Sequence, residues 1–335
     1  MTRRDERGTA SPMVVMVDRD LPFDSSQWQR LMAELSRDHV VMLGADSGDD
    51  LGAVEVALLA KERVELLERA PALRWVHCDQ SELSGIASRQ VIDRMVVTGA
   101  AGRPADALAE HGLLFALMLA FDYPAFYAAQ SRHEWRCHPS MANLRPLAGR
   151  TMGIIGLGNT GRALAGRARA LDMSVLGYRR KSGPLPSGVS QVFCRDRGES
   201  IARILEVSDI VVLTVPLSDR TRGMIGREQL ARMRSSSFLI NLSRGEVIDQ
   251  DALLWALQQR VIAGAGIDVT TPEPLPADHP LWDAPNLLIT PHFTPASPLR
   301  AERSLQIILE NINRYRNGAP LLDRLAAEDE WSGRD

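Results

Sequence analysis

The chain has few cysteines, little net charge and no long apolar run. Its three cysteines, Cys78, Cys137 and Cys194, lie in no CxxC spacing, which argues against a disulfide framework and favours a reducing cytoplasm. The formal net charge is -3, so binding to nucleic acid or to anionic lipid is not expected. The longest apolar run, residues 112–121, has about half the length that crosses a bilayer and predicts a buried helix. No metal site is predicted.

What the chain does contain is an alternation of short β-branched runs with helical segments. This pattern predicts parallel sheets that are covered by helices on both faces. The expected fold class is α/β, with a Rossmann-type doubly wound parallel sheet and a second, smaller flavodoxin-like α/β domain. The strands of the smaller domain are predicted at 13–18, 39–44, 73–78 and 95–100, with helices near 26–37 and 57–69. Those of the larger sheet are predicted at 151–158, 173–178, 209–216, 237–243, 263–269 and 286–292.

The two predicted domains divide the chain unevenly. Residues 104–295 are expected to bind the dinucleotide, with one long helical stretch over 104–131 that Pro104 can start. Residues 1–103 and 296–335 are expected to form the substrate-binding domain, because the last helical segment returns to the first half of the chain.

A glycine-rich turn follows the predicted strand at 151–158. In the spacing Gly156-x-Gly158-x-x-Gly161, the first glycine permits a tight turn, the second lets the backbone approach a pyrophosphate, and the third lets the helix pack on the strand. The helix N-terminus supplies N–H groups for the phosphates. A strand before the turn and a helix after it are the context that supports dinucleotide binding, and the predicted site includes Leu157, Asn159 and Thr160.

The next strand ends at three cations, Arg179, Arg180 and Lys181. An acid that binds the ribose 2′-hydroxyl of NAD usually follows this strand. A guanidinium can instead hold a 2′-phosphate bidentately, so the run favours NADP(H). The alternative is a solvated basic turn, with NAD(H) held through other contacts.

Three more side chains follow predicted strands: Arg244, Glu273 and His292. Each of these residues alone could have a purely structural role. Ligands bind beyond the carboxyl ends of parallel strands, however, and all three residues can converge there. Arg244 can pair with a substrate carboxylate and polarise a keto oxygen. His292 can give that oxygen a proton and take it back, and Glu273 can hold the imidazole and favour its protonated form. The set predicts hydride transfer between a nicotinamide and a 2-keto acid/2-hydroxy acid pair.

With these motifs the chain resembles the D-isomer-specific 2-hydroxyacid dehydrogenases, and most closely the glyoxylate/hydroxypyruvate reductases that prefer NADPH. The matching stretches are "RPADALAEHGLLFALMLA", "GIIGLGNTG", "SDIVVLTVPLSDRTRGMI", "LINLSRGEVIDQDAL", "GAGIDVTTPEPLP" and "NLLITPH". The resemblance implies a substrate-binding Arg244, an acid/base His292 paired with Glu273, and a homodimer formed through the cofactor domains with Trp135 in the reaching segment. It also implies that Asp268 lies near the nicotinamide carboxamide. The remaining predicted cofactor residues are Val215, Pro216, Leu217, Thr221, Leu242 and Ser243, and the remaining substrate residues are Gln80 and Ser81.

Two stretches depart from the family pattern. Glu82 and Ser84 stand where a glycine and an aspartate usually help to hold the substrate carboxylate, and Phe293 and Pro295 replace small residues after His292. A residue with a Cβ resists positive φ, and a glutamate that faces a carboxylate is unfavourable. Because of these departures the substrate is not identified, and one alternative is a dehydrogenase of the same fold that acts on a different small acid. A second alternative is a non-catalytic NAD(P)(H)-sensing protein like the corepressors that share this fold.

Overall fold

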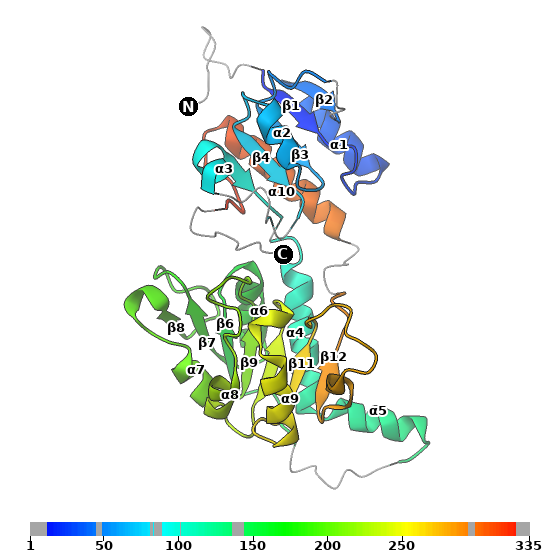
Figure 1. Cartoon of the computed structure of the whole chain (residues 1–335), viewed down its shortest axis with the longest axis vertical. Helices are drawn as coiled ribbons and strands as arrows, with labels where there is room; N and C mark the ends of the chain where they lie inside the picture. The colour runs from blue at the N-terminus through cyan, green and yellow to red at the C-terminus, as the bar shows by residue number, and fades with distance from the viewer. Residues whose placement is uncertain are drawn as a thin grey trace. The chain divides into compact units, whose positions relative to one another are not determined.

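The chain divides into two compact units, and each is described by itself. The computed structural model describes residues 12–44, 49–80, 83, 89–100, 102–135, 144–293 and 299–325 (Figure 1). Unit 1 consists of Met1–Arg103 with Ser297–Asp335, and unit 2 consists of Pro104–Ala296.

Unit 1 is a five-stranded parallel sheet in the order β2-β1-β3-β4-β5, the order of flavodoxin-like folds. Its strands are β1 Val14–Val17, β2 Val40–Leu43, β3 Val56–Leu59, β4 Trp75–Cys78 and β5 Val96–Thr98. Its helices are α1 Ser25–Leu35, α2 Val64–Arg69, α3 Arg89–Arg94 and α10 Arg300–Arg316. The apolar face of α10 carries Leu305, Ile308 and Ile312 into one core cluster with Val15 and Trp75. The last helix therefore completes the core of the unit that the N-terminal residues begin.

One predicted element of unit 1 is wrong at its start. A helix was expected over 57–69, but Val56–Leu59 form the central strand β3 and the helix α2 begins at Val64. All four residues of β3 are buried, because the strand lies between β1 and β4. A continuous apolar run of this length has neither a strand's alternation nor a helix's stripe, so periodicity alone cannot assign it.

A buried ion pair lies where β4 ends. The Arg103 guanidinium Nη1 donates to Asp79 Oδ2 at 2.7 Å, to the Asp79 carbonyl at 3.0 Å and to Ser304 Oγ on α10 at 3.2 Å. The two charged side chains are 4% and 1% exposed. Burial raises the pKa of Asp79 and lowers the pKa of Arg103, and in both cases it outweighs the attraction of the partner. Burial therefore opposes the charged forms of both side chains, while their mutual attraction favours those forms.

The sheet of unit 1 also buries a histidine completely. His77 on β4 is 0% exposed, and its Nδ1 lies 3.0 Å from Thr98 Oγ1, which also accepts a hydrogen bond from the Trp75 indole at 2.9 Å. Among the described residues, His77 Nε2 has no hydrogen-bond partner. Burial, with a smaller contribution from the charge of Arg103, lowers the pKa of His77 to about 3.

This burial predicts a loss of stability in acid. The unfolded chain binds a proton at His77 near its ordinary pKa of about 6.5, and the folded chain does not until about pH 3. Neutral His77 therefore leaves the free energy of unfolding unchanged above about pH 6.5. Below that pH the free energy of unfolding falls by about 1.4 kcal/mol per pH unit. We expect His77→Gln to reduce the slope of unfolding free energy against pH between 6 and 4 by about this amount, as urea titrations measure. Equal slopes for the native chain and the variant would exclude the effect.

Unit 2 is a parallel sheet in the order β12-β11-β10-β9-β6-β7-β8, which together with unit 1 confirms the predicted fold class. Its strands are β6 Thr151–Ile155, β7 Ser174–Arg179, β8 Gln191–Cys194, β9 Ile210–Leu213, β10 Phe238–Asn241, β11 Gly264–Ile267 and β12 Leu287–Ile289. Its α-helices are α4 Ala105–Ala120, α5 Tyr123–Ser131, α6 Asn159–Ala170, α7 Ala202–Val207, α8 Arg227–Arg232 and α9 Gln250–Gln258, with 3-10 turns at Arg195–Arg197, Gly245–Val247 and Pro280–Asp283. The sequence predicted six of the strands and missed β8, a four-residue edge strand.

The helical stretch expected over 104–131 is two helices. Asp122 adopts a left-handed conformation with φ 51°, and α4 and α5 meet there at a bend of 71°. Figure 1 shows α5 extending away from the sheet of unit 2. Pro124 lies in the first turn of α5, where proline is common, so this residue was the signal for a second helix. Within the described residues no single helix is long and apolar enough to span a membrane, although α4 and α5 taken together meet that test.

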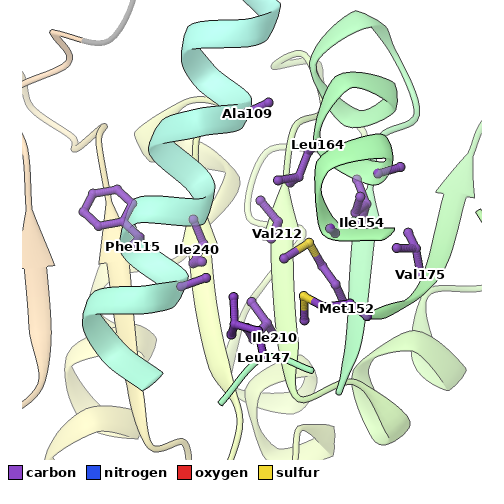
Figure 2. Packing of buried hydrophobic residues seen from close by; sticks show 14 of the residues in the cluster. Ala109, Phe115, Leu147, Met152, Ile154, Leu164, Val175, Ile210, Val212 and Ile240 are labelled. Atoms are coloured by element: carbon purple, nitrogen blue, oxygen red, sulfur yellow. The ribbon is translucent and has the colours of Figure 1, made fainter. Parts of the chain in front are cut away.

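The core of unit 2 fixes the sheet beneath the site. Figure 2 shows Ala109 and Phe115 on α4, Leu164 on α6 and Ile154 on β6 among the packed side chains of this cluster. Gly112 lets α4 lie close to the end of β10, because a Cβ there would lie 2.9 Å from Leu242 Cδ1. Side chains of α4 and α6 therefore pack in one cluster with those of β6, β9 and β10.

Candidate active site

The predicted site residues of unit 2 follow strands that all run in the same direction. The glycine-rich turn follows β6, Arg179 ends β7, Val215–Leu217 follow β9, Leu242–Arg244 follow β10, Asp268 and Glu273 follow β11, and His292 follows β12. Because every neighbouring pair is parallel, these segments lie along one edge of the sheet. In open α/β sheets that edge is where ligands bind.

The glycine-rich turn has the geometry that a bound pyrophosphate requires. Gly156 has φ 109°, and a Cβ there would lie 2.7 Å from the backbone of Thr214. A Cβ at Gly161 would lie 2.0 Å from the Gly156 carbonyl oxygen. A Cβ at Gly158, the N-cap of α6, would instead meet no described atom within 4 Å. Contacts within the protein therefore require glycine at positions 156 and 161. The open space at Gly158, in front of a helix N-terminus, fits a phosphate group.

The side chains around this turn are divided between the core and the edge. Leu157 is 6% exposed and packs on Gly177 of β7, so only its backbone can face a ligand. Asn159 and Thr160 form the first turn of α6, where Asn159 Oδ1 accepts a hydrogen bond from Arg162 at 2.7 Å. The backbone of residues 157–160 is therefore the part of this turn that can bind phosphates.

The cationic loop after β7 is ordered by its own hydrogen bonds. The Arg179 guanidinium donates to the Gly183 carbonyl, and Asp196 accepts from the backbone and hydroxyl of Ser182 at 2.6 and 2.8 Å. The backbone hydrogen bond from Ser182 is the main cause of a lowered Asp196 pKa. Arg179 is half-buried, and its Nε has no hydrogen-bond partner among the described residues. Arg180 is half-buried and Lys181 is exposed.

The segments after β9 and β10 present backbone more than side chain. Val215 and Leu217 pack against a core cluster, and the Thr221 hydroxyl donates to the Pro216 carbonyl at 2.7 Å and accepts from Ser218 N. Leu242 is 5% exposed in the core beneath α4. These residues shape the edge of the sheet, and any ligand contact from Leu242 must come from its backbone.

Asn241 orders the loop that carries Arg244. Its amide donates to the Arg244 carbonyl at 2.9 Å, and its Oδ1 accepts from the N–H and hydroxyl of Ser243 at 3.0 and 2.6 Å. Arg244 is half-buried, and its Nη1 donates to the Ser243 carbonyl at 2.6 Å. The next residue, Gly245, lies so close to the loop after β11 that a Cβ would be 2.2 Å from the Thr270 carbonyl carbon. The loops after β10 and β11 are thus in direct contact.

Glu273 and His292 are hydrogen-bonded to each other across neighbouring loops. His292 Nδ1 lies 2.8 Å from Glu273 Oε2, and Glu273 Oε1 accepts from Thr270 N at 3.0 Å. His292 has φ 49°, a conformation that non-glycine residues seldom adopt. With both carboxylate oxygens engaged, Glu273 fixes the imidazole ring and holds its Nδ1, which directs the chemistry to Nε2.

Asp268 is buried just after β11, beside the side chains of Thr290 and His111. It is 1% exposed, its Oδ1 accepts from the Thr290 hydroxyl at 2.6 Å, and His111 Nδ1 lies 3.9 Å from the same oxygen. Thr290 Oγ1 also lies 3.3 Å from His111 Nε2. Burial lowers the pKa of His111, although the Asp268 charge opposes this, so the histidine is neutral near neutral pH.

The predicted substrate residues of unit 1 are only partly described. Gln80 Oε1 accepts from Glu62 N at 3.0 Å and from Cys78 Sγ at 3.5 Å, so its carbonyl serves the loop itself. Ser81, Glu82 and Ser84 lie outside the described residues. In unit 2, Pro295 also lies outside them, whereas Phe293 contacts the His111 ring at a centroid distance of 5.2 Å.

Sequence reasoning missed several residues that hold the predicted site residues in place. His111 entered only within a quoted stretch that resembles the family, and Thr290 and Asn241 only as parts of predicted strands. A signal existed for Thr290, because a hydroxyl two residues before a candidate histidine sits at the same strand end. No cluster of three or more metal-ligating side chains occurs within the described ranges.

Comparison with known proteins shows which family the chain resembles. A model of the "D-isomer specific 2-hydroxyacid dehydrogenase, NAD binding domain" matches residues 113–294. The chain is 36% identical over 262 residues to a glyoxylate reductase of Korarchaeum cryptofilum, which covers 76% of each chain. A D-isomer specific 2-hydroxyacid dehydrogenase of Xanthobacter autotrophicus, solved with NADPH and MES, is 29% identical with a TM-score of 0.76, over 96% of this chain and 100% of that one. An NADPH-dependent glyoxylate/hydroxypyruvate reductase of Sinorhizobium meliloti, solved with NADP and sulfate, is 25% identical with a TM-score of 0.73, over 95% and 100%.

The family match covers most of unit 2, and the relatives match across both units. The resemblance inferred from the sequence motifs is thereby confirmed. The chain belongs to the D-isomer specific 2-hydroxyacid dehydrogenase family and is a nicotinamide-dependent oxidoreductase of that family.

Proposed function

We propose that this protein reduces a small 2-keto acid of the glyoxylate or hydroxypyruvate type to its D-2-hydroxy acid, with NADPH as the preferred coenzyme. The observation that carries the proposal is the Glu273–His292 pair at 2.8 Å, on the same sheet edge as Arg244 and the glycine-rich turn. An acid/base group, a cation for a carboxylate and a dinucleotide cradle are the three parts that this reaction needs.

In this proposal each side chain has a separate task. The reduced nicotinamide, when bound, supplies a hydride to the keto carbon. Arg244 pairs with the substrate carboxylate and stabilises the negative charge that develops on the keto oxygen. His292 donates the proton from Nε2 to that oxygen, and Glu273 stabilises the imidazolium before transfer. In the reverse direction His292 accepts the proton from the hydroxyl.

The coenzyme would be held mainly by backbone. Residues 157–160 would bind the pyrophosphate at the α6 N-terminus, with Gly156 and Gly161 forming the turn. Asp268 would face the nicotinamide carboxamide, and the loops after β9 and β10 would line the path between them, with Pro216, Thr221 and Ser243.

The preference for NADPH rests on the loop after β7. The residue that ends this strand is not an acid but Arg179, which is followed by Arg180 and Lys181. The loop is already ordered through the Asp196–Ser182 hydrogen bonds, so little ordering entropy opposes binding of a 2′-phosphate.

A steady-state screen tests the proposal. We expect turnover with glyoxylate or hydroxypyruvate, higher kcat/KM with NADPH than with NADH, and a loss of about tenfold to a hundredfold in kcat/KM for NADPH in Arg179→Asp. Arg203→Asp, at an exposed position of α7, makes the same charge change at a residue outside the predicted site and is expected to keep the NADPH preference. Equal kcat/KM with NADH in the native chain would contradict the preference, and no turnover with any 2-keto acid would contradict the function.

The same screen addresses the non-catalytic alternative. The three relatives described above are named as enzymes, which does not favour an NAD(P)(H)-sensing corepressor. Turnover would remove that possibility, whereas binding of coenzyme without turnover would support it.

We further propose a cytoplasmic homodimer. The two described cysteines, Cys78 and Cys194, are free and buried, as suits a reducing compartment.

The face formed by α4, α5 and the segment after α5 exposes large apolar side chains that a second copy of the chain would cover. They are Leu114, Leu117, Phe121, Tyr123, Tyr127 and Trp135. Sedimentation equilibrium would give the mass in solution.

A further inference from the structure

A chain of polar contacts runs from α4 to the end of β11 and has no part in the proposed proton transfer. His111, Thr290 and Asp268 come from three separate elements, yet the contacts His111–Thr290 and Thr290–Asp268 are 3.3 and 2.6 Å. His111 and Asp268 are 5% and 1% exposed. A buried carboxylate is costly unless donors satisfy it, so these neighbours help to determine how the Asp268 carboxylate is oriented.

The direction of each hydrogen bond follows from the chemistry of the groups. A carboxylate only accepts, so the single hydroxyl hydrogen of Thr290 points to Asp268. Thr290 Oγ1 must then accept from His111, which places the ring hydrogen of the neutral histidine on Nε2. The sequence His111 N–H to Thr290 O–H to Asp268 is therefore polarised toward the carboxylate, and such chains strengthen each bond.

Thr290 also reaches His292 through its backbone. The Thr290 carbonyl accepts from His292 N at 3.1 Å, within the turn that gives His292 its left-handed conformation. The same residue thus orients Asp268 with its side chain and supports His292 with its main chain. His111 is in turn held by aromatic rings, Phe115 at 4.4 Å and Phe293 at 5.2 Å between centroids.

We propose that His111 and Thr290 form a positioning relay that sets the orientation of Asp268 for the nicotinamide ring of the coenzyme. The inference rests on the proposed function, and it adds that coenzyme affinity depends on a helix residue, His111, that touches neither substrate nor phosphates. Phe293 anchors the relay by closing on the His111 ring, which gives the departure from small residues after His292 a role.

Paired substitutions test the relay through NADPH binding in the absence of substrate, measured by fluorescence titration. Thr290→Val keeps the shape and removes the donor, and we expect its Kd for NADPH to rise about tenfold to a hundredfold. Thr290→Ser restores the hydroxyl and should recover most of the affinity. On α4, His111→Phe should weaken binding, and His111→Gln, whose amide can donate in place of Nε2, should recover part of it.

Ser237→Ala provides the control, because Ser237 is also fully buried and donates only to the Arg234 carbonyl at 2.7 Å. It should leave the Kd for NADPH unchanged even if it lowers stability. Unchanged affinity in both Thr290→Val and His111→Phe, or no recovery in either conservative variant, would overturn the relay alone. If Thr290→Val does not fold, the two His111 variants decide. A native chain that binds neither NADPH nor NADH would overturn the proposed function as well.

Discussion

Replacing His292 by alanine is expected to lower kcat for 2-keto acid reduction by about 10²- to 10⁴-fold, with little change in coenzyme binding. The reason is that His292 acts on a proton during the reaction, while Glu273 already holds its Nδ1 in the resting site. Because the residue has φ 49°, alanine also introduces backbone strain. His292→Asn separates the two effects, since asparagine tolerates this conformation and cannot transfer the proton.

The comparison with Arg244→Ala makes this prediction sharper. Arg244 holds the substrate in the ground state and in the transition state, so its loss should raise KM as well as lower kcat. His133→Ala, at an exposed histidine that follows α5, should leave both constants unchanged. Near-native turnover in His292→Asn, with the best 2-keto acid, would remove His292 from the proton transfer.

Replacing Asp79 by alanine is expected to lower the free energy of unfolding by about 3–5 kcal/mol. The substitution leaves the Arg103 guanidinium 4% exposed with no carboxylate at 2.7 Å, and arginine does not lose its proton in proteins. Since small and medium domains are stable by only about 5–15 kcal/mol, urea denaturation should show a large fall in the midpoint.

The opposite half of the pair should behave differently. In Arg103→Met the remaining Asp79 can take up a proton, and burial already raises its pKa, so we expect a smaller loss that shrinks further as the pH falls. Glu228→Ala, which breaks an exposed pair with Arg232 at 3.1 Å, should cost less than about 1 kcal/mol. If Asp79→Ala lowers the free energy of unfolding no more than this control does, the desolvation of the buried pair cancels its whole contribution to stability.

Much of the fold was predictable because, in the sequence of unit 2, short β-branched runs alternate with helical segments. The errors occur where local pattern and tertiary context disagree. Val56–Leu59 are uniformly apolar because β3 is buried on both faces, so no period distinguished them from the helix after them. The break at Asp122 depends on one backbone angle, φ 51°. The apolar run before it does not reveal the break, and Pro124 in the first turn of α5 is the sequence signal that was not used.

The site was predictable as far as it depends on strand ends. Arg244, Glu273 and His292 lie after consecutive strands of a parallel sheet, so identifying those strands in the sequence also identifies the residues at their carboxyl ends. His111 was not predictable in this way, because it lies 179 residues from Thr290 and enters the site from a helix. Its role depends on the packing of α4 against the sheet, which is a property of the whole unit.

The composition of unit 1 from both ends of the chain has a consequence for the order of folding during synthesis. Its core needs Leu305, Ile308 and Ile312 of α10, and Arg103 meets Ser304 across 201 residues. Unit 2 is one continuous segment, Pro104–Ala296, so its sheet can close while the N-terminal strands still wait for α10 to leave the ribosome. During that interval the apolar positions Val15 and Trp75 lack their final partners, and at a synthesis rate of about 5–20 residues per second the roughly two hundred intervening residues extend this exposure to tens of seconds. The N-terminal third of the nascent chain is therefore the part that we expect a chaperone to bind, and it is released when the last helix docks.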